Sequence, residues 1–304
     1  MAGSLDDKDW GIILRRIRDG KCTPFLGAGA SYGVLPLGSE IAQEWAEAYG
    51  YPLDDTHNLI RVAQFLAIEE GDGLFPKELL LQKFQGVAAP DFARLDEPHS
   101  TLASLPLPVY LTTNYDSFMT QALRFHHRDP FREICRWSQA VQDRFGDRPS
   151  VFDSEPPFEP TVANPIVFHL HGIDEYAESL VLTEDDYFDF MIQMSRDEGR
   201  RGGILPPRIA RSIGGNSLLF LGYAINDWNF RVLFRSLVSY VQLALGLAHV
   251  SVQVAPGHDA AKVKKIEDYL TRYYGKLNIR VYWGTCQEFS TELLQRWTDF
   301  NGSR

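Results

Sequence analysis

Four short segments of the sequence carry residue types that can bind a phosphorylated ligand and move a proton. They are Gly27-Ala-Gly-Ala-Ser31, Thr112-Thr-Asn-Tyr-Asp116, His169-Leu-His-Gly172 and Gly222-Tyr-Ala-Ile-Asn-Asp227. Paired glycines allow a tight turn and let a phosphate lie against bare backbone. Amide and carboxylate side chains can bind hydroxyl or amide groups, and an imidazole can accept a proton near neutral pH. Together the segments favour a nucleotide site with acid–base chemistry.

The glycine-rich segment departs from the two commonest phosphate-binding motifs. Tyr32 stands where the dinucleotide fingerprint GxGxxG has its third glycine. The glycine spacing of a Walker A loop also occurs, but Ser39 and Glu40 stand where that loop has lysine and serine or threonine. A purely structural tight turn therefore stays open as an alternative for Gly27–Ser31.

Each of the four segments follows an apolar run that is predicted to be a buried strand. These runs are Pro24–Leu26, Pro108–Thr113, Pro165–His171 and Ser217–Leu221, and two further strands are predicted at Val250–Val254 and Ile279–Trp283. Helical periodicity lies between the runs. The alternation predicts a Rossmann-like α/β fold, with a mostly parallel sheet and helices on both faces. The carboxyl ends of such strands meet at one edge, where ligands bind.

We expect one domain over residues 1–304, with a core at about 20–245 and a C-terminal βαβ-like extension at about 246–304. A long helix is predicted at about 227–245. Residues 126–164 are rich in proline, aspartate and arginine and are predicted to form an irregular or helical insertion. No internal repeat divides the chain further.

Two of the segments allow a structural explanation beside the chemical one. Asp116 can cap the helix expected after the second strand, and this is the simpler reading of that residue. His169 and His171 are two residues apart, which would place both imidazoles on one face of a strand. His171 is favoured as a base because it ends the strand directly before Gly172. His169 stays open as its rival.

An acidic cluster at Glu184–Asp186, with Asp189, could suggest a divalent metal site. A helix capped by Thr183, with acidic residues in its first turn, is the favoured reading because it suits the helix dipole. No metal is therefore expected. The sequence also lacks the HExxH motif, so the zincin class has no support.

Composition and charge limit the partners and the compartment. The formal net charge is −10 and the pI is about 5.3, which argues against a dedicated nucleic-acid binder. Three dispersed cysteines can build neither a disulfide framework nor a four-cysteine zinc site, which favours a reducing cytoplasm. The N-terminal residues lack the apolar core of a signal peptide. The apolar stretch Leu237–Val254 is predicted to be a helix end and a strand rather than a membrane span.

In their order along the chain, the four segments resemble those of sirtuin-family domains over roughly residues 20–245. The closer resemblance is to the sirtuin-like NAD hydrolases of bacterial antiphage defence. Three stretches carry it: Thr112–Asp116, Leu182–Tyr187 and Phe220–Phe230. The chain departs from deacylating sirtuins because it lacks the cysteine pairs of their zinc ribbon. It also has Leu35–Glu40 where they have Pro-Asp-Phe-Arg.

The resemblance implies NAD+ as substrate and a role for each matching residue. Asn114 would bind the ribose and orient the attacking water, and Asp116 would engage the nicotinamide amide. His171 would act as general base on the ribose hydroxyls or the water. The turn at 27–31 would hold the pyrophosphate, and the loop at 222–227 would border the adenosine. The residues expected to bind the dinucleotide are Gly27, Ala28, Gly29, Ala30, Ser31, Thr113, Gly222, Tyr223, Asn226 and Asp227.

The expected function is therefore cleavage of the nicotinamide–ribose bond to give nicotinamide and ADP-ribose, depleting NAD+ as the effector of an abortive-infection system. A cyclised product stays open. Two alternatives are an NAD-dependent protein deacylase and a non-catalytic subunit that binds NAD or ADP-ribose. An acetylated peptide incubated with NAD+ separates the first alternative, and the presence of both Asn114 and His171 argues against the second.

The chain is expected to leave little room for a separate sensor domain, so its control is expected to come from other chains. We expect a homo-oligomer, a separately encoded regulatory partner, or both. The resemblance implies three kinds of partner: a DNA-translocating ATPase, a nucleotide-hydrolysing subunit or an Argonaute-like protein. Direct binding to nucleic acid or to a membrane is not expected.

Overall fold

The computed structural model describes residues 5–156, 158–197, 204–224, 231–232, 234, 247–254 and 260–302. Within them, seven strands form one sheet in the order β3-β4-β2-β1-β5-β6-β7, and all neighbouring pairs are parallel. The strands are β1 (Cys22–Leu26), β2 (Val109–Thr112), β3 (Phe131–Ile134), β4 (Ile166–His169), β5 (Ser217–Leu221), β6 (His249–Gln253) and β7 (Ile279–Trp283). The predicted Rossmann-like fold with a parallel sheet is confirmed.

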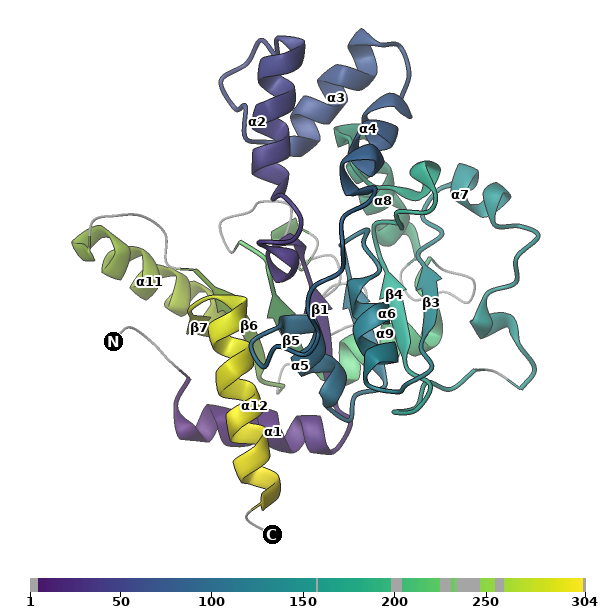
Figure 1. The fold of residues 1–304 in the computed structure, drawn as a ribbon. Coiled ribbons are helices and arrows are strands. Elements are labelled where there is room, and N and C mark those ends of the chain that lie inside the picture. Colours follow the sequence, from purple (N-terminus) through teal and green to yellow (C-terminus); the bar gives the residue numbers. More distant parts are fainter. Residues whose placement is uncertain are drawn as a thin grey trace.

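Helices cover both faces of this sheet (Figure 1). The layer on one face consists of α1 (Asp7–Arg18), α5 (Pro98–Ser104), α6 (Phe118–Phe125) and α12 (Cys286–Gly302). The layer on the other face includes α8 (Glu184–Asp197), α9 (Pro207–Gly215) and α11 (Ala260–Gly275). Because both faces are covered, β1, β2, β4 and β5 are buried along their whole length.

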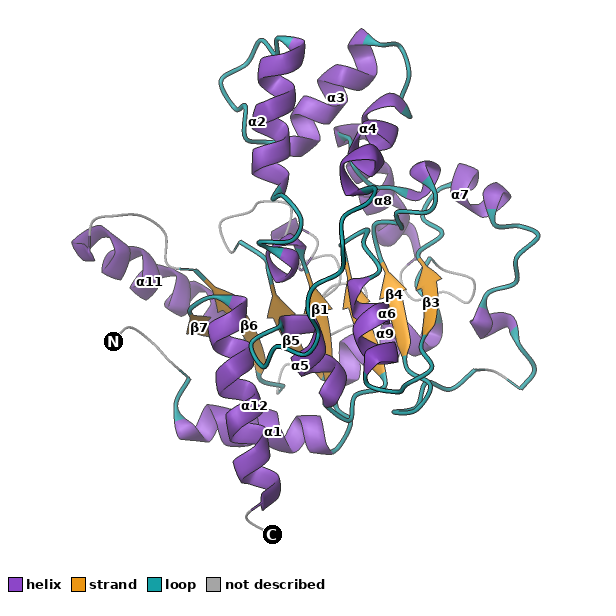
Figure 2. Ribbon diagram, in the orientation of Figure 1, coloured by secondary structure: helices purple, strands orange, loops and turns teal. Residues whose placement is uncertain are grey.

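Three further helices form a separate bundle that we call the helical lobe. They are α2 (Gly38–Tyr49), α3 (Leu59–Glu69) and α4 (Phe75–Phe84). The lobe has its own apolar core around Trp45, Leu66 and Leu80, and this core includes Leu180 and Leu182 from the segment before α8. In Figure 2 the arrowheads of β3 and β4 point towards the lobe, so it stands beyond the carboxyl edge of the sheet.

Polar contacts attach the lobe to α8, one of them largely buried. The ammonium group of Lys77 donates to Oδ1 of Asp186 at 2.7 Å, and both side chains are largely buried. The amide of Gln64 donates to Asp185 at 2.9 Å and its oxygen accepts from the backbone N–H of Asp185 at 3.0 Å. Asp186 also accepts from the N–H of Thr183 at 2.9 Å, which helps to fix the start of α8.

Several helices form where capping and apolar periodicity predict them. The carboxylate of Asp6 accepts from the N–H of Asp9 at 2.7 Å and caps α1. Thr183 accepts from the N–H of Asp186 at 3.2 Å, so the capped-helix reading of the acidic cluster at 184–186 is confirmed. The long helix predicted at 227–245 lies outside the described residues.

The segment 126–164 is more ordered than predicted. It contains the edge strand β3, which pairs with β4, together with α7 (Gln139–Arg144) and the short 3₁₀-helix η2 (Val151–Asp153). The strand has no apolar run because Arg132 and Glu133 occupy its middle, as an edge position permits. Helices α5 and α9 were also not predicted, although Pro98 and Pro207 stand at their first positions, where proline is favoured.

The last two strands continue the main sheet, with β6 beside β5 and β7 beside β6. Helix α12 returns to the face covered by α1, where Phe289 stacks on Trp10 with ring centroids 5.4 Å apart. No helix within the described residues combines the length and apolar character needed to cross a bilayer.

Candidate active site

The predicted glycine-rich turn and the loop after β5 are in direct backbone contact. Gly27 leads into a 3₁₀-helix, η1 (Ala28–Ser31). Gly222 has a φ of +80°, and a β-carbon on it would lie 2.2 Å from the nitrogen of Ala30 and 2.5 Å from the oxygen of Gly27. A β-carbon on Gly29 would lie 2.9 Å from the α-carbon of Gly222. Only glycine fits at this contact.

Three amides of the turn are used inside the protein. The N–H of Gly27 donates to the oxygen of Leu221 at 2.8 Å, and the N–H of Gly29 donates to the oxygen of Gly222 at 2.9 Å. The N–H of Ala30 donates to the oxygen of Gly27 at 2.9 Å. Close packing of the two loops therefore explains the glycines. A pyrophosphate bound at this turn would have to contact groups other than these three amides.

Asn114 lies at the carboxyl end of β2 and bridges to the turn. Its side-chain nitrogen donates to the oxygen of Gly27 at 3.1 Å and to the hydroxyl of Ser31 at 3.4 Å. Its backbone N–H donates to the hydroxyl of Thr112 at 2.9 Å. The side chain is therefore buried and oriented from both ends, as a group that must position a reactant needs to be.

Asp116 makes a helix-capping contact and also contacts the glycine-rich turn at 27–31. One carboxylate oxygen accepts from the N–H of Phe118 at 3.0 Å at the start of α6, and the other accepts from the hydroxyl of Ser31 at 3.2 Å. Burial raises the pKa of this carboxyl group, and the nearby His99 opposes that effect. The capping contact and the contact with the turn are made at once.

Tyr223 and Thr113 complete the contact between the ends of β1, β2 and β5. The hydroxyl of Tyr223 donates to the oxygen of Leu26 at 2.7 Å and lies 2.9 Å from the hydroxyl of Thr113. The sequence-predicted residues from Gly27 to Ser31, and from Thr113 to Asp116, therefore meet Gly222 and Tyr223 at one edge. Asn226 and Asp227 lie outside the described residues.

His171 lies at the same edge, after the end of β4, but in apolar surroundings. Its ring packs edge-on against Tyr187 and Phe190 of α8, with centroids 5.2 and 5.1 Å away. It is 3% exposed, and its Nε2 atom is buried without a hydrogen-bond partner among the described residues. Burial lowers the pKa of this imidazole to about 3, so the ring is neutral at physiological pH.

The chain turns sharply after His171. Gly172 has a φ of +93°, and a β-carbon on it would lie 2.2 Å from the oxygen of Ser179. The oxygen of His171 accepts from the N–H of Val181 at 2.9 Å, and Ser179 is held by the indole N–H of Trp137 at 2.9 Å. Glycine is required at position 172 because a β-carbon would collide with the backbone of Ser179. This close packing fixes the backbone of His171.

His169 occupies different surroundings from His171. Its Nδ1 lies 2.9 Å from the backbone oxygen of Asn114, and its Nε2 accepts from Nε of Arg132 at 3.1 Å. Strand β4 ends at His169, so the period of two that predicted a shared face does not continue to His171. Both ring nitrogens of His169 have hydrogen-bond partners, whereas Nε2 of His171 has none within the described part of the chain.

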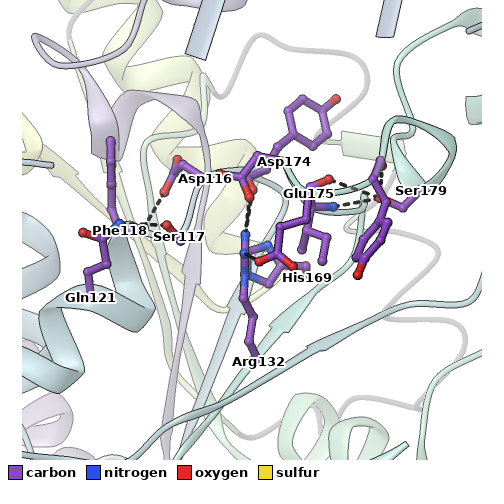
Figure 3. Close-up of polar contacts among 12 residues, drawn as sticks. Asp116, Ser117, Phe118, Gln121, Arg132, His169, Asp174, Glu175 and Ser179 are labelled. Carbon is purple, nitrogen blue, oxygen red and sulfur yellow. Dashed lines mark hydrogen bonds and ion pairs between the residues drawn. The ribbon is translucent and has the colours of Figure 1, made fainter. Parts of the chain in front are cut away.

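Sequence reasoning missed Arg132, which holds several of these groups together (Figure 3). Besides His169, its guanidinium contacts Asp174, Glu175 and the backbone oxygen of Tyr115. No signal in the sequence pointed to it, because the edge strand that carries it was not predicted.

Two cavities lie beside the site residues described above. A cavity of about 360 Å³ borders Ala30 and Ser31 and is completed by Glu97 and by Thr285 at the start of α12. The C-terminal segment thus contributes to the neighbourhood of the turn. A second cavity of about 580 Å³ lies between α4 of the helical lobe and Arg132. Neither lining includes Asn114 or His171, which lie deeper.

Among the described residues, no group of three or more His, Cys, Asp or Glu side chains is placed so that it could hold a metal ion. The site has instead an amide, a carboxyl group and a neutral imidazole at the ends of adjacent strands. This set can orient a polar substrate and accept a proton.

The buried histidines predict an acid-sensitive fold. Burial lowers the pKa of His171 to about 3 and that of His249 to about 4, and it lowers the pKa of His169 well below 6.5. Below pH 6.5 the unfolded chain therefore binds more protons than the folded one. The free energy of unfolding should fall with decreasing pH, each histidine contributing up to about 1.4 kcal/mol per pH unit.

Urea unfolding from neutral to mildly acidic pH measures this slope. The exposed His57 provides the control, since His57→Gln should leave the slope unchanged while His171→Gln should reduce it. A stability that stays constant as the pH falls from about 6.5 to about 5 would contradict the prediction.

Comparison with known proteins bears on the same segments. The family model described as "SIR2-like domain" matches residues 108–274, which is more than half of the chain and includes Asn114, His171 and Gly222. A chain from the solved structure "Structural Basis for the Mechanism and Regulation of Sir2 Enzymes" is 12% identical, with a TM-score of 0.44 over 97% of this chain and 100% of that one.

Among curated proteins, the chain is similar to "NAD(+) hydrolase ThsA" of Enterococcus faecium, with 26% identity over 72% of this chain and 41% of the relative. The protein of the same name from Bacillus cereus (strain MSX-D12) is 24% identical over 67% of this chain and 37% of the relative. The chain spans about two fifths of the length of these relatives. The match of the family model over more than half of its residues shows that the chain belongs to the SIR2-like domain family.

Proposed function

We propose that this protein hydrolyses NAD+ at the bond between nicotinamide and ribose. The observation that carries the proposal is the buried Nε2 of His171, which has no hydrogen-bond partner among the described residues and lies at the same sheet edge as Asn114. A buried polar atom of this kind costs free energy unless a ligand satisfies it. The name of the curated relatives supports NAD+ as that ligand.

The reaction needs little acid catalysis, because the cationic nicotinamide leaves as a neutral molecule with the bonding electron pair. A water oxygen bonds to ribose C1′ and one proton is released. The protein must hold the ribose, place the water and accept that proton. Burial lowers the pKa of His171 to about 3, so the buried ring is a weak base, and the displacement of its apolar cover on ribose entry makes it a stronger one. The amide of Asn114 can orient the ribose or the water.

The other residues bind the dinucleotide in this proposal. Asp116 lies next to Asn114 and can accept from the nicotinamide amide, since only one of its oxygens is needed to cap α6. The turn at 27–31 and the loop at Gly222 and Tyr223 meet the pyrophosphate and the adenosine. His171 is covered by Tyr187 and Phe190, so entry of the ribose requires a displacement of α8.

Replacing Asn114 by alanine should reduce NAD+ hydrolysis by at least about 100-fold. The side chain removed is the one that bridges the turn and β2, so the reactants lose their orientation. Nicotinamide and ADP-ribose released by the purified protein, quantified by liquid chromatography with mass spectrometry, measure the change. Asn164→Ala, at the opposite edge of the sheet before β4, is the matched control and should retain full turnover.

Equal turnover by the Asn114 variant and the wild type would overturn the assigned site. The same assay with an acetylated peptide added separates hydrolysis from NAD-dependent deacylation, which would produce an acetylated ADP-ribose. Calorimetric binding of NAD+ without turnover under every condition tried would favour a non-catalytic binding subunit.

We further propose that the activity depletes NAD+ as the effector of a bacterial antiphage system in the cytoplasm. This rests on the resemblance of the segments at 112–116, 182–187 and 220–230 to sirtuin-like NAD hydrolases of such systems. Its control is assigned to a homo-oligomer or to a separately encoded partner. In infected cells NAD+ should fall with the wild-type protein and stay constant with Asn114→Ala.

A further inference from the structure

The guanidinium of Arg132 connects three strand ends. It lies on β3 at the edge of the sheet, and its side chain is 13% exposed. One nitrogen donates to Asp174 and to the backbone oxygen of Tyr115, both at 2.9 Å, and another donates to Glu175 at 2.7 Å. Figure 3 shows Arg132 directed at Asp174, with His169 beside it. The loops after β2 and β4 are thereby tied together.

The remaining nitrogen of the guanidinium fixes the state of His169. An arginine can only donate, so Nε2 of His169 must accept the bond of 3.1 Å from Arg132. The other ring nitrogen, Nδ1, lies 2.9 Å from the backbone oxygen of Asn114, which can only accept. Nδ1 must therefore carry the proton. The two contacts together allow a single form of the ring, neutral and protonated at Nδ1.

This chain of contacts ends at the candidate catalytic amide. The backbone oxygen of Asn114 is held through His169, its N–H is held by Thr112, and its side chain donates to Gly27. Arg132 also holds the oxygen of Tyr115, the next residue along the chain. The backbone on both sides of the Asn114 carbonyl is thus fixed from the edge strand.

We propose that Arg132 is a positioning residue that acts through His169 to set the orientation of Asn114 for the cleavage of NAD+. The proposal rests on the function proposed above, and it assigns His169 to orientation rather than to proton transfer. Neither residue touches the substrate in this assignment. The forked geometry of arginine is needed, because a lysine ammonium cannot reach the ring and the two loops at once.

Arg132→Gln tests the proposal by kinetics. It should lower kcat by about tenfold or more with a smaller change in KM, because a misplaced Asn114 affects the transition state more than binding. Arg132→Lys should recover little of the loss. The matched control is Arg124→Gln, which lines the same cavity but lies on the exposed side of α6, and it should keep the wild-type kcat.

A second measurement does not depend on activity. In protein labelled with ¹⁵N at histidine, the long-range ¹H–¹⁵N spectrum distinguishes the two neutral forms of each ring, and His169→Gln identifies the signal. His169 should be protonated at Nδ1 in the wild type and in Arg124→Gln. In Arg132→Gln the ¹⁵N signal of Nε2 should shift, since Nε2 has lost its hydrogen-bond donor, while Nδ1 keeps its proton on the Asn114 oxygen.

Three results would overturn the proposal: protonation of His169 at Nε2 in the wild type, an unchanged His169 signal in Arg132→Gln, or an unchanged kcat in that variant. If the wild-type chain cleaves no NAD+, the proposed function fails first. The role of Arg132 towards NAD+ then fails with it, while the spectrum still reports whether Arg132 fixes His169.

Discussion

Replacement of His171 by phenylalanine is expected to abolish NAD+ hydrolysis and to raise the free energy of unfolding by about 1–2 kcal/mol at neutral pH. Phenylalanine is larger than the imidazole but keeps a flat aromatic ring that can pack edge-on against Tyr187 and Phe190. It removes a buried nitrogen that has no partner among the described residues. The substitution therefore removes the proposed base and a destabilising group in one step.

Urea unfolding without NAD+ measures the gain in stability. His249→Phe is the matched control, because Nδ1 of that equally buried histidine accepts from the N–H of Leu218 at 2.9 Å. The same substitution should destabilise the protein there, since it leaves the N–H unpaired. A His171→Phe variant that is less stable than the wild type, or one that still cleaves NAD+, would contradict the expectation.

The second large effect is expected at Gly222. Gly222→Ala should lower the free energy of unfolding by at least about 3 kcal/mol and eliminate turnover. Its positive φ accounts for about 1 kcal/mol. The remainder comes from the β-carbon, which would lie 2.2 Å from the nitrogen of Ala30. Backbone that close cannot adjust without separating the turn at 27–31 from β5.

Gly50→Ala isolates the conformational part of this cost. Gly50 has a φ of +67°, close to that of Gly222, and apart from its chain neighbours no atom of the described residues lies within 4 Å of the position of its β-carbon. Thermal or urea unfolding of both variants should show a small loss for Gly50→Ala and a much larger one for Gly222→Ala. Equal losses would mean that the two loops do not depend on their close packing.

The sequence predicted the sheet, and it placed the candidate site residues at one edge of that sheet, because these signals are local. A fully buried parallel strand is a short apolar run, and the residues just after it fall at the carboxyl edge whatever the details of the loops. Gly27, Asn114 and Gly222 could be assigned to a common edge on that basis. The structure brings these residues into contact through the oxygen of Gly27.

The sequence could not predict contacts that depend on three-dimensional register. Strand β3 carries arginine and glutamate at its centre and sits at the edge, so it lacks the apolar run by which the others were found. Because Arg132 lies on this strand, it was not predicted as a site residue. The different surroundings of His169 and His171 were also hidden, since a strand periodicity cannot show where the strand ends.

The attachment of the helical lobe to α8 makes two distant parts of the molecule thermodynamically linked. Lys77 and Gln64 hold the first turn of α8, and the next turn places Tyr187 and Phe190 on His171. A force applied to the lobe is therefore transmitted to the ring through one rigid helix. By reciprocity, if a ligand on the lobe binds the two positions of α8 with different affinity, it changes the affinity for substrate by the same factor by which substrate changes its own.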